Sequence, residues 1–280
     1  MFGGIGKHVE GGIMNDNVRK PISYRNEINP VWCKACGDYG VLKSFTRAFA
    51  KLNLPNEQIA VISGIGCSSR LPGYCDTYGF NSVHGRPLPI ATGLKTARPE
   101  LTVIACGGDG DAFAIGIGHI PHAIRRNVDL SYFVMDNSIY GLTKGQASPT
   151  TSIETKQRKG LAAVDETPLN PMLFVLSAGA GFVARTQAGD MVHMTEMLAQ
   201  AIQYPGFSFI HCLSVCVTYQ GRQFQEQLEK DVHFLPESYN SGDLDAAFEV
   251  ARKDPWALGV IYKKPLDSKE FGYKPEPVEE

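Results

Sequence analysis

Two stretches, ACGGDGDAFAIG at residues 105–116 and FVMDNSIYGLTKGQ at residues 133–146, show how this chain is organised. The first stretch begins at the end of a short apolar run at 101–105, and the second begins within another at 130–135. Each run predicts a buried β-strand. Apolar residues with helical spacing predict a helix over 112–126, between the two strands. A strand, a helix and a second strand form a βαβ unit, in which the two strands run parallel.

The same alternation continues through the rest of the chain. Further strands are predicted at 59–63 (IAVIS), at GFVAR (181–185) and at FSFIHCLSV (207–215), and further helices at 38–52, 86–98 and 189–203. Short apolar strands that alternate with helices indicate a parallel sheet covered on both faces. The predicted fold class is therefore α/β, a mostly parallel sheet with helices on both faces.

Three regions are expected along the chain. Residues 1–27 are Gly-rich and predict an N-terminal arm, 28–225 form the predicted domain, and 226–280 form a C-terminal extension expected to contact a partner subunit. The polar stretch 143–170 is too long for an ordinary connection and predicts a functional loop or lid. The tail after Pro265 is polar and contains several prolines, which is typical of disorder or of a partner-binding segment.

The composition excludes several classes of function. The net charge of −2, with 20% charged residues, gives no electrostatic reason to expect a nucleic-acid partner. No apolar run reaches membrane-spanning length, and the N-terminus lacks the pattern of a secretory signal, so a cytoplasmic protein is expected. Thiols stay reduced in that compartment, so paired cysteines among the seven are better candidates for metal or cluster ligands than for disulfides.

The two opening stretches also place possible metal ligands. Asp109 follows one strand, and Asn137 follows the next, 28 positions later. The carboxyl ends of parallel strands meet at one sheet edge, where carboxylate, amide and carbonyl oxygens suit Mg²⁺. Glycines 107, 108 and 110 allow a diphosphate to approach the backbone. The GDG…Asn spacing matches the thiamine-diphosphate motif; the alternative is a tight turn followed by a capping Asn.

Four cysteines form a candidate ligand set. Cys33 and Cys36 make a CxxC pair, and Cys67 and Cys216 each follow a predicted strand at the edge that carries Asp109. Four cysteines suit zinc or a [4Fe–4S] cluster equally well on spacing alone. Cys106 and Cys212 fall in apolar strand patterns and are expected to be small buried hydrophobic residues, and Cys75 is expected to be structural.

Taken together, these segments resemble the β subunits of the 2-oxoacid:ferredoxin oxidoreductases, most closely the two-subunit type exemplified by 2-oxoglutarate:ferredoxin oxidoreductase. The resemblance covers residues 27 to 225 and rests on WCKACG, GIGCS, HGR, LPIATGLK, GGDGDAFAIG, RRN, DNSIYGLTKGQ, SPT and GFSFIHCLSVC, in that order. It implies a thiamine-diphosphate-binding (pyrophosphate-domain) fold.

The resemblance also implies the ligands of one [4Fe–4S] cluster: Cys33, Cys36, Cys67 and Cys216. The family usually has Gly where this chain has Ala35, and Pro where it has Val215. Both departures lie beside implied ligands, and the first is expected to alter the surroundings of the cluster without changing its ligation.

The family's thiamine-diphosphate contacts correspond to Ile65, Gly66, Cys67, Ser68, His84, Gly110, Asp111 and Gly141, and its Mg²⁺ ligands to Asp109, Asn137 and the carbonyl of Ile139. Arg70, Leu142 and Lys144 correspond to positions near the substrate; the alternative for the two cations is a solvated surface position. His84 could instead cap a helix or lie in the core. His119 and His122 are expected to be packing or surface residues.

The implied reaction is oxidative decarboxylation of a 2-oxoacid, with 2-oxoglutarate favoured, to an acyl-CoA and CO₂. Thiamine diphosphate supplies the electron sink, CoA is the co-substrate, and electrons leave one at a time through the cluster to ferredoxin. The reverse reaction fixes CO₂. The family supplies the activating glutamate from an α subunit, so this chain is expected to be active only with that subunit, as α2β2.

Three alternatives remain open at this stage. The first is a β subunit that uses pyruvate or a broad range of 2-oxoacids. The second is a non-redox thiamine-diphosphate decarboxylase subunit with a structural Cys₄ zinc site, and the third is a non-catalytic electron-transfer subunit that uses only the cluster.

Overall fold

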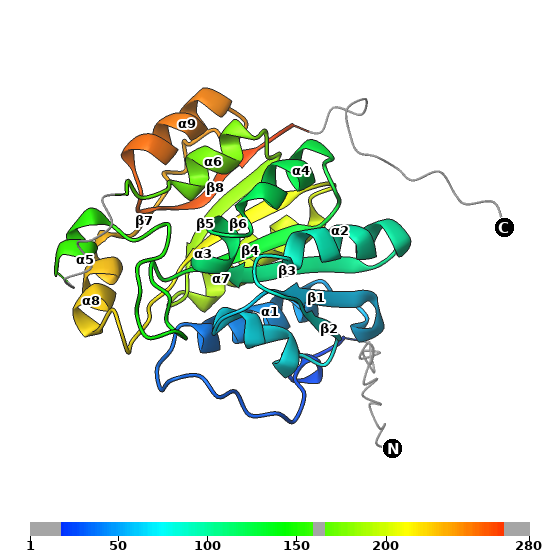
Figure 1. The fold of residues 1–280 in the computed structure, drawn as a ribbon. Helices are drawn as coiled ribbons and strands as arrows, with labels where there is room; N and C mark the ends of the chain where they lie inside the picture. The colour runs from blue at the N-terminus through cyan, green and yellow to red at the C-terminus, as the bar shows by residue number, and fades with distance from the viewer. Residues whose placement is uncertain (1–17, 159–165, 266–280) are drawn as a thin grey trace, which may run out of the picture.

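A computed structural model describes residues 18–158 and 166–265 of the chain. Its sheet has eight strands in the order β2-β1-β3-β4-β6-β5-β8-β7 (Figure 1). The strands are β1 Ile59–Ser63, β2 Tyr78–Asn81, β3 Thr102–Gly108, β4 Ser131–Asp136, β5 Phe182–Gln187, β6 Ser208–Leu213, β7 His233–Phe234 and β8 Ala257–Lys263. The six strands from β2 to β5 in this order pair in parallel, and β8 pairs antiparallel with β5. The expected mostly parallel α/β sheet is confirmed.

Helices cover both faces of this sheet (Figure 1). Buried side chains of α1 and α7 pack on one face, and those of α2, α4, α6 and α9 pack on the other. The helices are α1 Asp38–Lys51, α2 Pro87–Ala97, α3 Asp109–Phe113, α4 Ile120–Arg125, α5 Ile153–Arg158, α6 Pro171–Ser177, α7 Met191–Gln203, α8 Arg222–Asp231 and α9 Leu244–Lys253. None of them combines the length and hydrophobicity needed to span a bilayer. The strands alternate their side chains between the two hydrophobic layers, as a sheet buried on both faces requires.

The helix expected over 112–126 is interrupted, and this prediction was wrong in its middle. The chain forms α3 and α4 with a 3₁₀ turn between them. Gly116 packs against backbone at the break, where a β-carbon would lie 2.4 Å from the carbonyl oxygen of Asp111. Pro121 then lies in the first turn of α4, where its missing N–H costs nothing.

The chain after residue 225 contributes to the same sheet. We expected residues 226–280 to form an extension, but β8 pairs with β5, and α9 packs on the layer beneath it. Residues 266–280 and 1–17 lie outside the described part of the chain. Within the predicted arm, Tyr24 is buried, and its hydroxyl donates to the carbonyls of Leu54 and Phe49, at 2.8 and 3.2 Å. Of the expected loop 143–170, residues 153–158 form α5, and 159–165 are not described.

The order of the strands reverses at β1, and we refer to the loops at the carboxyl edge of the sheet there as the crevice. From β1, the chain adds β2 on one side and then returns to add β3 on the other. Ligands of open α/β sheets bind where the strand order reverses in this way. The loops after β1, β3 and β4 carry the residues singled out from the sequence, so the fold gathers them at this edge.

Candidate functional site at the carboxyl edge of the sheet

Asp111 ties together the loops that meet in the crevice. Its Oδ1 accepts hydrogen bonds from the backbone N–H groups of Ile65, at 3.0 Å, and Gly85, at 2.8 Å. The Nδ1 atom of His84 lies 2.7 Å from the same oxygen. The predicted cofactor contacts Ile65, His84 and Asp111 are therefore neighbours, although they come from three separate segments of the chain.

The second oxygen of Asp111 is a candidate contact for a ligand. Asp111 Oδ2 is buried and has no hydrogen-bond partner among the described residues. Buried polar atoms are normally paired, so an unpaired carboxylate oxygen calls for a donor. Glycines surround it: a β-carbon on Gly107 would lie 3.0 Å from this oxygen. The crevice therefore fits a group that brings its own N–H or O–H donor.

The predicted Mg²⁺ ligands lie side by side at the carboxyl ends of the neighbouring strands β3 and β4. Asp109 begins α3 and is 2% exposed. Its Oδ1 accepts from the backbone N–H of Asn137, at 3.3 Å, and the side-chain oxygen of Asn137 accepts from the N–H of Ile139, at 3.1 Å. A carboxylate, an amide and a nearby carbonyl form a hard donor set that suits Mg²⁺.

Sequence reasoning missed the side chains that hold this turn. The hydroxyl of Thr150 lies 3.0 Å from Asp109 Oδ2 and 2.9 Å from Asp136 Oδ1, so it bridges two buried carboxyl groups. The hydroxyl of Thr151 donates to the carbonyl of Ser138, at 2.6 Å. Both threonines belong to the segment that begins with the SPT motif, and no local pattern in that segment indicates these contacts.

The two carboxyl groups oppose each other electrostatically. Burial, together with the charge of Asp136, raises the pKa of Asp109 to about 8. Burial also acts to raise the pKa of Asp136, but hydrogen bonds from His211 and Thr150 outweigh it, so this pKa lies below its usual value. Asp136 therefore carries the charge, and a cation beside Asp109 would relieve the repulsion.

The predicted cluster ligands lie near one another, at the other side of the segment 65–68. Cys33 and Cys36 precede α1, and the N–H of Cys36 donates to the carbonyl of Cys33, at 3.0 Å. The indole N–H of Trp32 donates to the carbonyl of Cys67, at 2.7 Å. The hydroxyl of Thr218 lies 3.2 Å from the sulfur of Cys33, so the segment that follows Cys216 also reaches this group.

Cys216 lies between the cysteine group and the predicted Mg²⁺ turn. A β-carbon on Gly141 would lie 3.3 Å from its sulfur. Its carbonyl accepts from the N–H of Gln220, at 2.8 Å, and the side-chain amide of Gln220 donates to the carbonyl of Asn137, at 3.0 Å. Gln220 Oε1 is buried without a partner among the described residues. No sequence motif singled out Gln220, because its role depends on the loop that returns to Asn137.

The electrostatics agree with a cluster of thiols around a buried carboxyl group. Burial raises the pKa of Cys67, and the nearby Asp38, Cys216 and Cys33 raise it further. Burial raises the pKa of Asp38 to about 6, and this carboxyl group shares a hydrogen bond with Cys36. Across residues 18–158 and 166–265, no three acidic, His or Cys side chains converge tightly enough for a single metal ion.

The remaining predicted positions are less constrained. Arg70 lies on the exposed side of the 3₁₀ helix Ser68–Tyr74, and Leu142 and Lys144 are exposed in the loop after β4. Nothing in the described residues tests their proximity to a substrate, so it stays a prediction. His119 is half-buried and His122 is exposed, and Cys75, Cys106 and Cys212 are buried, all as expected.

Two family models match this chain. The model described as thiamine pyrophosphate enzyme, C-terminal TPP binding domain, matches residues 64–212. The model of the C-terminal part of the pyruvate ferredoxin oxidoreductase beta subunit matches residues 216–271. The first includes the crevice and the Asp109–Asn137 turn, so this part of the chain is a thiamine-diphosphate-binding domain.

Individual relatives agree with these models. The beta subunit of 2-oxoacid:ferredoxin oxidoreductase 1 from Aeropyrum pernix is 37% identical over 87% of this chain and 81% of its own length. The 2-oxoglutarate synthase subunit KorB from Methanocaldococcus jannaschii is 38% identical over 80% of this chain and 83% of its own length. Relatives named for 2-oxoacids and for 2-oxoglutarate are therefore both similar to at least four fifths of the chain.

A solved structure of a similar enzyme has the same fold as this chain. The 2-oxoglutarate:ferredoxin oxidoreductase from Magnetococcus marinus, with 2-oxoglutarate, coenzyme A and succinyl-CoA bound, is 40% identical and superposes with a TM-score of 0.85, covering 89% of this chain and 86% of that one. Since the family models, the relatives and the fold all agree, the chain belongs to the β subunits of the 2-oxoacid:ferredoxin oxidoreductases.

Proposed function

We propose that this β subunit, together with an α subunit, oxidises 2-oxoglutarate to succinyl-CoA and CO₂ and passes the electrons to ferredoxin. In this assignment the chain holds thiamine diphosphate, Mg²⁺ and one [4Fe–4S] cluster within a complex of α2β2 composition. Among 2-oxoacids, we propose 2-oxoglutarate as the substrate because the structure from Magnetococcus marinus, 40% identical to this chain, was solved with 2-oxoglutarate, coenzyme A and succinyl-CoA bound.

The observation that carries the proposal is the position of the short segment 65–67. At one end, Ile65 is hydrogen-bonded to Asp111 in the diphosphate crevice, and at the other end Cys67 lies among the other candidate cluster ligands. A structural zinc site or a separate electron-transfer centre would not need this arrangement. A redox reaction at the cofactor does need it, because the electron acceptor must lie close to the reacting carbon.

The described residues fit the proposed cofactor and metal. Asp109, Asn137 and the Ile139 carbonyl would hold Mg²⁺, and the unpaired Asp111 Oδ2 would accept a hydrogen bond from the cofactor. Ile65, Gly66, Cys67, Ser68, His84, Gly110 and Gly141 would line the same crevice. Bound thiamine diphosphate would supply the electron sink for loss of CO₂.

Other roles are divided between the two subunits. Cys33, Cys36, Cys67 and Cys216 would ligate the cluster, and Arg70, Leu142 and Lys144 would lie near the substrate, where a cation can pair with a carboxylate. We assign the activating glutamate to the α subunit. The β subunit alone is then expected to be inactive.

Metal analysis of the anaerobically purified αβ complex tests the cluster. We expect about four iron and four acid-labile sulfide per β subunit and no stoichiometric zinc. Serine at Cys33, Cys36, Cys67 or Cys216 should lower both iron and sulfide, whereas serine at the buried Cys212 should not. Zinc in place of iron and sulfide would contradict the redox assignment.

An anaerobic assay with CoA, a viologen dye and a panel of 2-oxoacids tests the substrate. 2-Oxoglutarate should give the highest kcat/KM. Pyruvate is the second candidate, because the family model that matches residues 216–271 is that of the pyruvate enzyme. A kcat/KM for pyruvate that equals or exceeds the value for 2-oxoglutarate would reject the preference and leave the family assignment intact.

A further inference from the structure

Three buried polar side chains form a row across the middle of the sheet. His211 on β6 is in register with Val134 on β4 and with Arg185 on β5, and Asp136 lies two residues beyond Val134. Side chains two residues apart on a strand share a face, so Asp136, His211 and Arg185 face the same layer. They are 5%, 5% and 3% exposed, in a layer that is otherwise hydrophobic.

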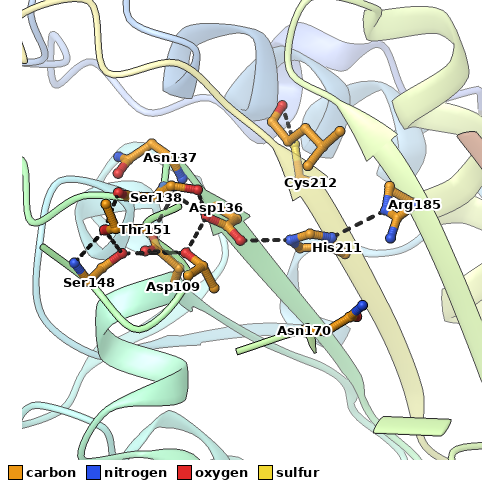
Figure 2. Close-up of polar contacts among 12 residues, drawn as sticks. Asp109, Asp136, Asn137, Ser138, Ser148, Thr151, Asn170, Arg185, His211 and Cys212 are labelled. Carbon is orange, nitrogen blue, oxygen red and sulfur yellow. Dashed lines mark hydrogen bonds and ion pairs between the residues drawn. The ribbon is translucent and has the colours of Figure 1, made fainter. Parts of the chain in front are cut away.

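The direction of each hydrogen bond in this row is fixed by Arg185. A guanidinium can only donate, and its Nε lies 3.4 Å from Nδ1 of His211. Nδ1 therefore accepts, and Nε2 carries the ring proton and donates to Asp136 Oδ2, at 2.8 Å (Figure 2). The guanidinium is itself anchored by the carbonyls of Asp254 and Ala257, at 3.0 and 3.3 Å, in the chain that leads into β8.

The other oxygen of Asp136 shapes the turn that follows β4. Asp136 Oδ1 accepts from the N–H of Ser138, at 2.8 Å, from its hydroxyl, at 3.1 Å, and from Thr150. Ser138 has a φ of 53°, in the left-handed region that residues other than Gly rarely adopt. The contacts with Asp136 hold Ser138 there, and Ser138 lies between the two proposed Mg²⁺ ligands Asn137 and Ile139.

We propose that His211 is a positioning residue for the Mg²⁺ site: by donating from Nε2 to one oxygen of Asp136, it aims the other oxygen at Ser138 and so fixes the turn that presents Asn137 and the Ile139 carbonyl. This inference rests on the proposed function, which places Mg²⁺ at that turn. Groups that orient metal ligands in this way typically change metal affinity by about 10–100-fold when they are removed.

Two variants of His211 separate hydrogen bonding from packing. The amide nitrogen of Gln reaches the position of Nε2, so His211→Gln keeps a donor for Asp136. Asn is shorter and reaches only the position of Nδ1, so His211→Asn keeps an acceptor for Arg185 but leaves Asp136 without its donor. Cys212→Ala is the matched control, because it alters the next residue of β6 on the opposite face of the sheet.

The experiment measures binding of thiamine diphosphate to the metal-stripped αβ complex by calorimetry, as a function of Mg²⁺ concentration. We expect His211→Asn to raise the Mg²⁺ concentration at half-saturation by about 10-fold or more. For His211→Gln, this Mg²⁺ concentration should stay within about threefold of the wild-type value. Cys212→Ala should have the wild-type value even if the melting temperature of the variant falls. Turnover is not needed for this measurement.

The outcomes also separate the two proposals. If wild-type binding does not depend on Mg²⁺, the proposed function fails. If wild-type binding needs Mg²⁺ but His211→Asn behaves like the wild type, or if His211→Gln is impaired as much as His211→Asn, the positioning role is rejected. Should His211→Asn not assemble, Ser138→Ala tests the same turn: a severalfold higher Mg²⁺ requirement supports the role, and an unchanged requirement overturns it.

Discussion

The carboxylate of Asp111 occupies the space that a side chain at residue 64 would need. A β-carbon on Gly64 would lie 1.9 Å from Asp111 Oδ2 and within 2.5 Å of the other two carboxylate atoms. Asp111 cannot move away easily, because its Oδ1 is tied to the loops at Ile65, His84 and Gly85. Gly64 is therefore a steric requirement of the crevice.

Gly64→Ala should destabilise the protein by about 1–3 kcal/mol, the usual cost of overpacking a buried site. It should also weaken thiamine-diphosphate binding, since Asp111 must shift. Gly93→Ala is the control, because a β-carbon there meets nothing within 4 Å in helix α2, and Ala should stabilise the helix by about 0.5–1 kcal/mol. Denaturant unfolding checks both values, and equal stability of the two variants would contradict the steric argument.

Asp109→Asn should change how the stability of the metal-free protein depends on pH. The folded-state pKa of Asp109, about 8, lies above the unfolded value of 3.8. The folded state therefore binds the extra proton, so the contribution of Asp109 is complete below about pH 4 and is lost as the pH rises toward 8. Asn cannot titrate, so the variant should lose less stability than the wild type between pH 5 and pH 8.

Thermal unfolding of both proteins in EDTA at several pH values measures this difference. The same variant should lose Mg²⁺-dependent binding of thiamine diphosphate. Asp245→Asn, which removes an exposed carboxylate from α9, controls for the change in net charge. Parallel pH profiles for wild type and Asp109→Asn would show that this group does not carry the effect.

Ala35→Gly should stabilise the loop between Cys33 and Cys36. Ala35 has a φ of 65°, where a β-carbon costs about 1–2 kcal/mol and glycine has no such penalty. Part of that gain is offset, because glycine also makes the unfolded chain more flexible. We expect a net stabilisation of up to about 1 kcal/mol with unchanged iron content. Asn53→Gly, at a φ of 49°, should gain less stability, because Asn tolerates this region better than Ala. Denaturant unfolding measures both variants, and a destabilised Ala35→Gly protein would contradict the prediction.

Asp38→Asn should make the reduction potential of the proposed cluster more positive. Asp38 is buried beside Cys36 and Cys67, so its carboxylate disfavours an added electron. Asn keeps the shape but removes the charge, and the shift should be on the order of tens of millivolts. Anaerobic redox titration followed by electron paramagnetic resonance measures it, with Asp245→Asn as the control. A potential that stays the same or becomes more negative would falsify this role for Asp38.

Much of the fold followed from local pattern. The strands at β1, β3, β4, β5 and β6 and the helices α1, α2 and α7 match their predicted positions closely, because burial on both faces and helical periodicity leave clear signals. β2 and β8 were missed: β2 is a short, exposed edge strand, and β8 is antiparallel and follows a region read as an extension. At the break between α3 and α4, Gly116 also packs against Gly85, where a β-carbon would lie 3.1 Å from the Cα of Gly85, and no local pattern records a contact between residues so far apart in the sequence.

By itself, the sequence determined which residues are candidates for the site: a Gly-Asp-Gly turn with Asn137 at the right spacing, a CxxC pair, and Cys67 and Cys216 after strands at one sheet edge. Those features are local, since each depends on a few residues next to a strand end. Only the tertiary structure decided that Thr150 bridges Asp109 and Asp136, and that His211 and Arg185 support Asp136 from neighbouring strands. The reason is that strand order and register are set by the packing of the whole sheet. His211 lies 26 positions from Arg185 and 75 positions from Asp136 in the sequence, so these residues become partners only once the sheet has formed.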